Sequence, residues 1–332
     1  MFLYRDILKQ SIKLTWTYKY LWFFGLFAAW LEATGGYKIF VQGLNGEKSA
    51  SFFNKSETIA ETGIFSSNIF TNIAALFQTD TLAMITLLLV ILIILALVVF
   101  LIWLTIISQV ALVNNSAKLF ASKISKIPKI NEGIMSGIAN FWPVTGLNIL
   151  SKLIIGLSVL MIGLPIFLFS AQTGGLANYL FIILFIIFIP IAIIFSFVIK
   201  YAIAYVVIKG LSFIESIKAG WHLFTNNWLV SIEMALILFL TNFLVSLGIL
   251  MAIMILAIPL LFLLLLFYKL LSIIGFWIIL ILGFFILLFV FMAGVASLTT
   301  FQISAWTKLF LELTSRGGAS KLMRVIGGLT KK

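Results

Sequence analysis

The chain has 332 residues, of which 63% are hydrophobic and only 10% charged, against the roughly 25% of charged residues in a soluble domain, so we expect an integral membrane protein. Ten Asp and Glu, one His and no Cys exclude thiolate metal sites, disulfides and Cys nucleophiles, and they predict a protein with no enzyme activity and no cofactor. The net charge of +12 comes from basic residues that border the apolar runs, which favours anionic membrane lipids over nucleic acid as the partner.

Six apolar runs follow one another along the chain and predict an all-α polytopic membrane protein with six transmembrane helices. About 20 apolar residues cross the roughly 30 Å of hydrocarbon in a bilayer, and five of the runs are longer than that. We therefore expect tilted spans or helices that continue into the cytoplasm. The first run is shorter and spans only if the aromatic residues before it dip into the headgroup layer. The runs are 21–34, 81–113, 142–170, 178–208, 228–261 and 271–306.

Basic residues are distributed unequally between the segments that connect these runs. Four segments hold sixteen Lys and Arg, whereas the alternate segments hold four. Because basic connections stay in the cytoplasm, the sequence predicts a multi-pass protein of the cell (cytoplasmic) membrane with both termini cytoplasmic. Residues 35–80 then form an external loop, and 313–332 form a basic cytoplasmic tail. The basic segments are 1–20, 114–141, 206–227 and 307–332.

Three of the basic segments resemble one another. Residues 11–16 read SIKLTW and residues 216–221 read SIKAGW, and a Trp follows each six or seven residues later. A weaker copy at 132–141 matches 215–224 at its Glu, Ile, Gly and Phe. Each copy precedes two apolar runs, which predicts a single membrane domain, 1–332, of three repeated units of interfacial helix plus helical hairpin. The alternative is that any amphipathic helix ending at a membrane border has such a pattern. The units are about 1–113, 114–208 and 209–312, and their short helices begin near 4, 130 and 212.

The short helices are amphipathic, with basic residues along one side and apolar residues along another. In the third, Ser212 and Glu215 form a capping-box pattern that begins the helix. We expect these helices to lie on the inner leaflet with ammonium groups toward lipid phosphates. The alternative is that they pack under the bundle as elbows between spans, and both can hold at once. The candidate headgroup contacts are Arg5, Lys9, Lys13, Trp16, Lys218 and Trp221.

Residues 205–228 resemble a known family. They read YVVIKGLSFIESIKAGWHLFTNNW. This sequence is similar to a segment of the membrane domain of prokaryotic glycerophosphoryl diester phosphodiesterases and its stand-alone relatives. In that segment a V-x-E-G motif is followed by an amphipathic helix that ends in a W-x-L motif. Residues 7–25 also look like the opening of bacterial members, although Lys209 stands where relatives often carry an acid. The resemblance implies the membrane domain alone, because the His-Arg-Gly and Glu-x-Asp signature of the family's catalytic barrel has no match here.

Two charged residues, Lys152 and Glu233, are the candidates within the apolar runs, where charge is expensive. They can form a structural ion pair, Lys152 can reach the headgroups alone, or the two can serve transport or a proton relay. Asn148 and Asn242 are expected to join helices by hydrogen bonds rather than to bind a substrate.

The favoured function is that of a non-enzymatic, lipid-contacting structural or adaptor module, and the sequence identifies no protein partner. The alternative is a small transporter or lipid-handling channel whose path runs between the hairpins near Lys152, Asn148, Glu233 and Asn242. A continuous polar cavity would favour transport, whereas a solid core of Leu, Ile and Phe would favour the structural module. An intramembrane enzyme is disfavoured because no two catalytic-type residues share an obvious depth.

Overall fold

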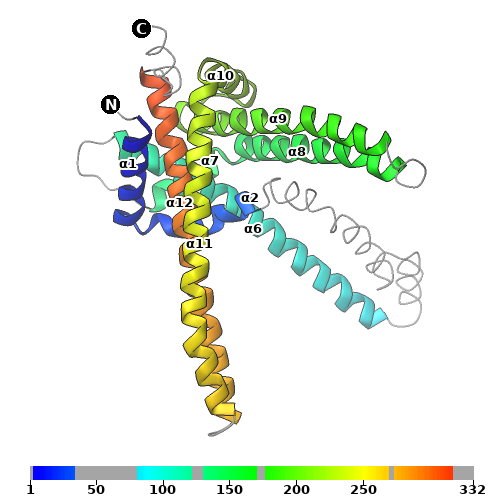
Figure 1. The fold of residues 1–332 in the computed structure, drawn as a ribbon, viewed down its shortest axis with the longest axis vertical. Coiled ribbons are helices and arrows are strands. Elements are labelled where there is room, and N and C mark those ends of the chain that lie inside the picture. Colours follow the sequence, from blue (N-terminus) through cyan, green and yellow to red (C-terminus); the bar gives the residue numbers. More distant parts are fainter. Residues whose placement is uncertain (1–2, 34–80, 122–129, 170–175, 269–272, 317–332) are drawn as a thin grey trace. The chain divides into compact units, whose positions relative to one another are not determined.

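The computed structural model describes residues 3–33, 81–121, 130–169, 176–268 and 273–316. Within these ranges every element is a helix and none is a strand (Figure 1), so the all-α class is confirmed for the described part. The predicted external loop lies outside the described residues. Of the predicted tail, only 313–316 are described, and they continue the last helix.

Five of the described helices are long and apolar enough to cross a membrane. A helix pairs its backbone groups internally and these runs place Leu, Ile, Val and Phe on all sides, which are the conditions for crossing hydrocarbon. The described helices therefore fit a multi-pass membrane protein. They are α6 (Thr81–Ala121), α8 (Phe141–Phe169), α9 (Leu176–Ala204), α11 (Trp228–Leu266) and α12 (Ile273–Arg316).

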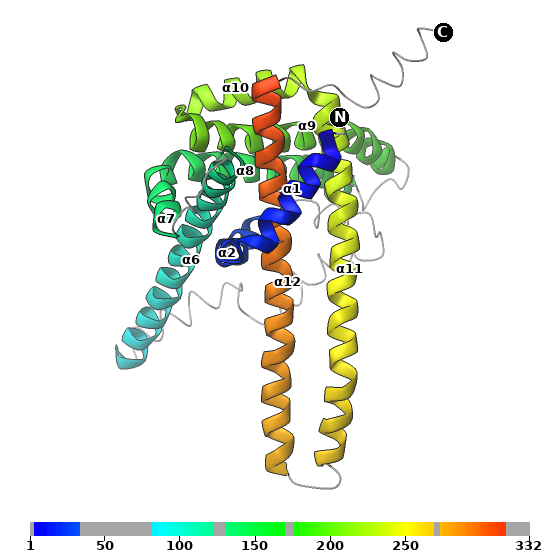
Figure 2. The same ribbon diagram turned by 90° about the vertical axis from the view of Figure 1, so that its left-hand side faces the viewer.

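The first apolar run forms a shorter helix. Helix α2 (Leu21–Ala33) has 13 residues, which at about 1.5 Å per residue extend over roughly 20 Å of the roughly 30 Å of hydrocarbon. Leu21, Phe24 and Ala28 are buried, and α2 lies against α12 (Figure 2). Five candidate spans are thus described, and a sixth stays a prediction.

Three other helices are short, and each directly precedes a more apolar helix. Helix α1 (Leu3–Thr17) leads into α2, α7 (Ile130–Ala139) into α8, and α10 (Phe213–Asn226) into α11. The capping box that begins α10 is present, because the backbone N–H of Ser212 donates to the Glu215 carboxylate at 3.2 Å. That the three short helices begin related units stays a prediction.

A π-helical turn, η1 (Tyr205–Lys209), joins α9 to α10. Gly210 follows it with a φ of 69°, a left-handed conformation in which any other side chain would crowd the backbone. The Gly210 N–H donates to the carbonyl of Val206 at 3.0 Å. Gly210 therefore lets the chain end one helix and enter the next within a few residues.

The chain divides into two compact units, which we describe separately. The first consists of 1–33, 105–151 and 193–332, and the second of 34–104 and 152–192. The boundaries lie inside α6, α8 and α9, so one end of each of these helices belongs to the first unit. Of the three predicted repeat units, the first (1–113) and the second (114–208) each contribute residues to both compact units. In the second unit, Ser158, Ile162 and Ala192 are buried.

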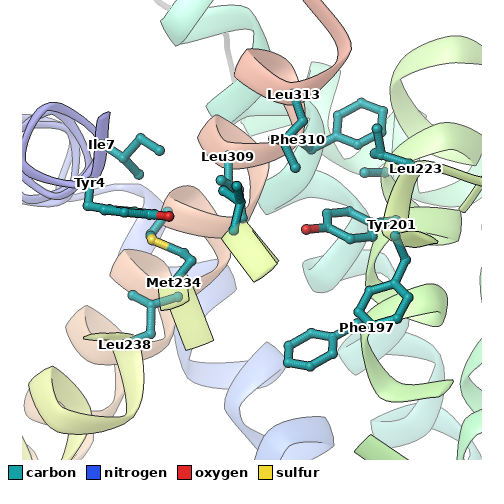
Figure 3. Packing of buried hydrophobic residues seen from close by; sticks show 14 of the residues in the cluster. Tyr4, Ile7, Phe197, Tyr201, Leu223, Met234, Leu238, Leu309, Phe310 and Leu313 are labelled. Carbon is teal, nitrogen blue, oxygen red and sulfur yellow. The ribbon is translucent and has the colours of Figure 1, made fainter. Parts of the chain in front are cut away.

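Two clusters of buried side chains form the core of the first unit. One cluster joins α1, α9, α10, α11 and α12, and in it Tyr201 and Phe310 are almost completely buried while Tyr4 lies next to Met234 (Figure 3). The other cluster joins α1, α2, α6, α8 and α9 and includes Ile303 of α12. The short helices α1 and α10 are therefore built into the protein core.

The buried side chains of α11 and α12 lie toward one end of this helix pair. On α11 Leu238 is buried, whereas Phe239 is 67% exposed. Residues 239–266 and 273–292 expose mainly Leu, Ile, Val and Phe, and the two helices run side by side there (Figure 1). Twenty-eight residues rise about 42 Å, which exceeds the hydrocarbon thickness. The helices thus present an apolar surface of membrane length and continue beyond it into the core of the first unit, whereas their continuation into the cytoplasm stays a prediction.

Candidate functional site

Helix α1 presents two different faces. Tyr4 and Ile7 are buried in the core, so the apolar face is covered by protein and packing is confirmed for it. The opposite face is basic and exposed, and exposed ammonium groups beside a Trp are suited to lipid headgroups at the membrane border. The exposed residues of α1 include Arg5, Lys9, Ile12, Lys13 and Trp16.

Helix α10 has a similar arrangement. Gly220 and Phe224 are buried, whereas Lys218 and Trp221 are exposed. The sequence places Trp221 on the same face as Gly220 and Phe224, but the Trp221 ring lies at the edge of that face, 47% exposed and 6.4 Å from the ring of Phe195. Trp221 is thus placed like Trp16, on an exposed surface beside basic residues.

Helix α7 packs on α6 through two glycines. A Cβ atom at Gly137 would lie 2.6 Å from Ile107 Cγ2 and 3.0 Å from the Ile107 carbonyl oxygen. A Cβ atom at Gly133 would lie 2.8 Å from Asn115 Nδ2. Gly133 and Gly137 are one helical turn apart, an arrangement of small residues that brings membrane helices into close contact.

The other two short helices also bury small residues four positions apart. In α10, Ser216 and Gly220 are buried, and a Cβ atom at Gly220 would lie 2.8 Å from the carbonyl oxygen of Val198 on α9. In α1, Ser11 and Thr15 occupy the matching positions of the SIKLTW motif and are buried. Helix α1 lies against α12. Each short helix thus packs against a long helix and buries a pair of small side chains.

Polar side chains also join neighbouring helices. Asn148 Nδ2 on α8 donates to Gln109 Oε1 on α6 at 2.8 Å. The hydroxyls of Tyr201 on α9 and Ser231 on α11 lie 2.7 Å apart. These hydrogen bonds satisfy groups that would be costly to leave unpaired in an apolar region.

Helices α2 and α12 cross at small residues. A Cβ atom at Gly25 would collide with Thr300 Oγ1 and with the carbonyl oxygen of Ala296. The single hydroxyl proton of Thr300 is shared between the carbonyl oxygen of Ala296 on its own helix, at 2.8 Å, and that of Leu21 on α2, at 3.2 Å. Helix α2, the second helix of the chain, therefore packs directly against the last described helix.

The structure places the four predicted polar candidates in different surroundings. Glu233 is half-buried on α11, and the hydroxyl of Tyr4 donates to its carboxylate. Asn148 contacts α6, and Asn242 is half-buried on α11. Lys152 is exposed on α8 and belongs to the second unit, so its pairing with Glu233 stays a prediction.

A small cavity of about 60 Å³ lies between α6, α9 and α12. Lys200, Gln109 and Trp306 are among its lining residues, and Lys200 Nζ lies 4.8 Å from the centroid of the Trp306 ring, within range of a cation–π interaction. Sequence reasoning named only Lys152 and Glu233 as charges within apolar runs and missed Lys200. Lys200 can be recognised from the sequence as a further candidate, because it is a charged residue inside the apolar run 178–208.

No family model, curated protein or solved structure matches the chain. The resemblance to the phosphodiesterase membrane domain is thus carried by short motifs of the sequence. Within the described ranges, no three His, Asp or Glu side chains form a group that could hold a metal ion. The function is therefore inferred from the contacts between helices within the first compact unit.

Proposed function

We propose that this chain is a non-enzymatic protein of the prokaryotic cytoplasmic membrane, with both termini cytoplasmic, that acts as a lipid-contacting structural or adaptor module. The observation that carries the proposal is the largely filled interior of the first unit, where apolar side chains form two clusters and polar ones such as Asn148 and Tyr201 bond to neighbouring helices. Transport requires a continuous polar path. A filled core instead suits a protein that binds lipids on its outer surface.

The lipid contacts are assigned to two kinds of surface. Acyl chains cover the exposed apolar stretches of α11 and α12. Headgroups contact the exposed basic side of α1 and Lys218 and Trp221 of α10. Each basic residue near an anionic surface contributes about 1 kcal/mol, a contribution that salt screens.

A three-unit repeat with six spans is part of the proposal. It is supported by a pattern of contacts that recurs between successive repeat units. The last helix of one repeat unit packs on the short helix of the next repeat unit, and it also forms a hydrogen bond to the helix that follows that short helix. Helix α6 contacts α7 and α8, and α9 contacts α10 and α11. Within the first compact unit, helix α12 in turn contacts α1 and α2, so the last repeat unit contacts the first as each of the others contacts the next.

A relation to the membrane domain of prokaryotic glycerophosphoryl diester phosphodiesterases belongs to the same proposal. It is supported by the motifs in 205–228. The phosphodiesterase activity is not carried over, because the chain has no match to the His-Arg-Gly and Glu-x-Asp signature.

The test compares the full-length protein in nanodiscs of neutral phosphatidylcholine with nanodiscs that also contain anionic phosphatidylglycerol. At low salt we expect a higher Tm in the anionic nanodiscs. High salt, or the combined change of Arg5, Lys9 and Lys13 to Gln, is expected to remove most of this gain because both weaken attraction to the anionic surface.

The control variant combines Lys118→Gln with Glu132→Gln. It removes an exposed ion pair of 3.1 Å without changing the net charge, so it is expected to keep the gain in Tm. Equal wild-type Tm values in the two lipid mixtures would contradict the headgroup contacts. Solute flux from proteoliposomes above that of protein-free liposomes would favour a transporter instead.

A further inference from the structure

We propose that the exposed side of α7 inserts into the boundary between the headgroups and the acyl chains of the bilayer, as an apolar contact that needs no positive charge. This inference rests on the lipid-contacting function proposed above and adds a surface of different chemistry to it. It combines the orientation of α7, the composition of its exposed side and its direct connection to α8.

The contact with α6 determines which side of α7 faces outward. Gly133 and Gly137 are buried, and a Cβ atom at Gly137 would lie 2.6 Å from Ile107 Cγ2, so a larger side chain does not fit between the helices. Met135 is midway between the two glycines in the sequence. At about 100° per residue it lies on the opposite side of the helix, and it is 71% exposed.

The outward side of α7 carries large apolar side chains and no basic residue. Ile130 and Ile138 are exposed in addition to Met135, and Ile138 is 54% exposed. The helix contains no Lys or Arg, and its only charged residue, Glu132, forms an ion pair with Lys118 on α6 at 3.1 Å. An exposed apolar patch beside polar residues is typical of a contact with a membrane or with another protein.

The connection to α8 favours the membrane. A single residue, Asn140, separates the two helices, and its N–H donates to the carbonyl of Ser136 at 3.1 Å while its carbonyl accepts from the N–H of Val144 at 3.2 Å. Trp142 follows in the first turn of α8 and is 79% exposed, and Trp is enriched at the border of a membrane. Since α8 is a candidate span from Phe141–Ile162, α7 is held close to the level at which that span begins.

The inferred contact differs in kind from that of α1. Helix α1 buries large side chains, Tyr4 and Ile7, and exposes basic ones, whereas α7 buries two glycines and exposes large apolar side chains. Attraction between basic residues and anionic headgroups is screened by salt. Removal of apolar side chains from water does not depend on such attraction, so the α7 contact is expected to persist in neutral lipid and at high salt.

The experiment uses the full-length protein, which has no Cys of its own, in phosphatidylcholine nanodiscs. A nitroxide spin label is attached to Met135→Cys or to Ile138→Cys. Electron paramagnetic resonance then measures the collisions of the label with oxygen, which concentrates in hydrocarbon, and with a Ni(II) chelate, which stays in water. Leu250→Cys, on the exposed apolar stretch of α11, is the hydrocarbon reference, and Ser315→Cys, exposed at the end of α12, is the water reference.

We expect the ratio of oxygen collisions to chelate collisions at Met135→Cys and Ile138→Cys to be several-fold higher than at Ser315→Cys and closer to that at Leu250→Cys. The ratio should not change when phosphatidylglycerol or high salt is added. The two labelled positions lie on exposed surface and are measured separately, so either variant provides the test if the other fails to fold.

Three outcomes would overturn the inference. A ratio equal to that at Ser315→Cys would place this side of α7 in water, and few collisions with either reagent would show that protein covers it. Dipolar broadening between labels on two copies of the chain would identify a second copy as the partner. A ratio typical of water together with an intact gain in Tm in anionic nanodiscs would contradict only the α7 contact, whereas a high ratio without that gain would contradict only the headgroup contacts of α1.

Discussion

The hydroxyl of Tyr4 donates a hydrogen bond to the carboxylate of Glu233, although 229 residues separate them in the sequence. Tyr4 is buried in α1, and Glu233 is half-buried in α11. A hydrogen bond to a charged group contributes about 1.5–3 kcal/mol. The contact therefore attaches α1 to α11 within the same core that holds α12 (Figure 3).

Replacing Tyr4 with Phe should lower the free energy of unfolding by about 1–3 kcal/mol, because the Glu233 carboxylate loses a donor while Phe keeps the packing. Glu233→Gln should weaken the same bond by removing the charge. A double-mutant cycle measured by unfolding in detergent should give a coupling of about 1–2 kcal/mol. Strictly additive effects would mean that the two side chains do not stabilise one another.

A second double-mutant cycle tests whether Lys152 pairs with Glu233. If they pair, Glu233→Gln leaves an ammonium group uncompensated and lowers Tm. Adding Lys152→Met should then restore much of the loss, because no uncompensated charge remains. Additive changes in Tm would contradict the pairing and leave Lys152 as a headgroup contact.

The glycine contact between α7 and α6 can be tested with a single methyl group. Gly137→Ala should destabilise the protein by about 1–3 kcal/mol, because the added Cβ collides with Ile107 and the helices must move apart. Gly156→Ala is the matched control, since a Cβ there meets nothing within 4 Å and alanine is the better helix former by about 0.5–1 kcal/mol. Equal Tm values for the two variants would show that α7 does not pack closely on α6.

The capping box of α10 should make stability depend on pH. Hydrogen bonds from Ser212 hold the pKa of the Glu215 carboxyl below its usual value of 4.5. Since the folded pKa is lowered, the contribution of Glu215 is present above the unfolded pKa and is lost as pH falls through the folded pKa. The Tm difference between wild type and Glu215→Gln should therefore be largest at neutral pH and disappear in acid.

Ser212→Ala is the partner variant for the capping-box test. In its background Glu215→Gln should change Tm very little at neutral pH, because the hydroxyl donor to the carboxylate is already missing. A Tm difference between wild type and Glu215→Gln that stays constant into acid would show that the capping bonds do not stabilise the charged carboxylate.

The predicted topology can be tested on the Cys-free wild-type background. Single Cys substitutions at Ser51 and Ser125 should be labelled differently in intact cells by a membrane-impermeant thiol reagent. The positive-inside rule places Ser51 outside and Ser125 in the cytoplasm. Labelling at Ser125 with protection at Ser51 would reverse the orientation.

The helices could be predicted from the sequence because each has a strong local signal. A run such as 228–261 is apolar on all sides and longer than a bilayer requires, and the Ser212 and Glu215 pair marks the first turn of α10. The burial of Tyr4 and Ile7 could not be predicted, because an apolar helix face is suited equally to lipid and to a protein core.

The candidate site could be predicted only in part. Asn148 and Glu233 were recognised as polar residues in apolar runs, but the sequence does not specify their partners, Gln109 and Tyr4, because these lie on other helices. Lys200 was overlooked as a candidate. Its cavity is formed by residues of α6, α9 and α12, and the packing of three distant segments has no signature in any one of them.

The hydrogen bond between Thr300 and Leu21 joins residues 279 positions apart. During synthesis at roughly 5–20 residues per second, α2 is made about 14–56 s before Thr300 is added to the chain. Until then Gly25 has no partner helix, and a largely apolar helix of 13 residues must remain in or near the bilayer without the contact that later holds it. Helix α2 is thus among the first parts to be made and among the last to reach its final packing.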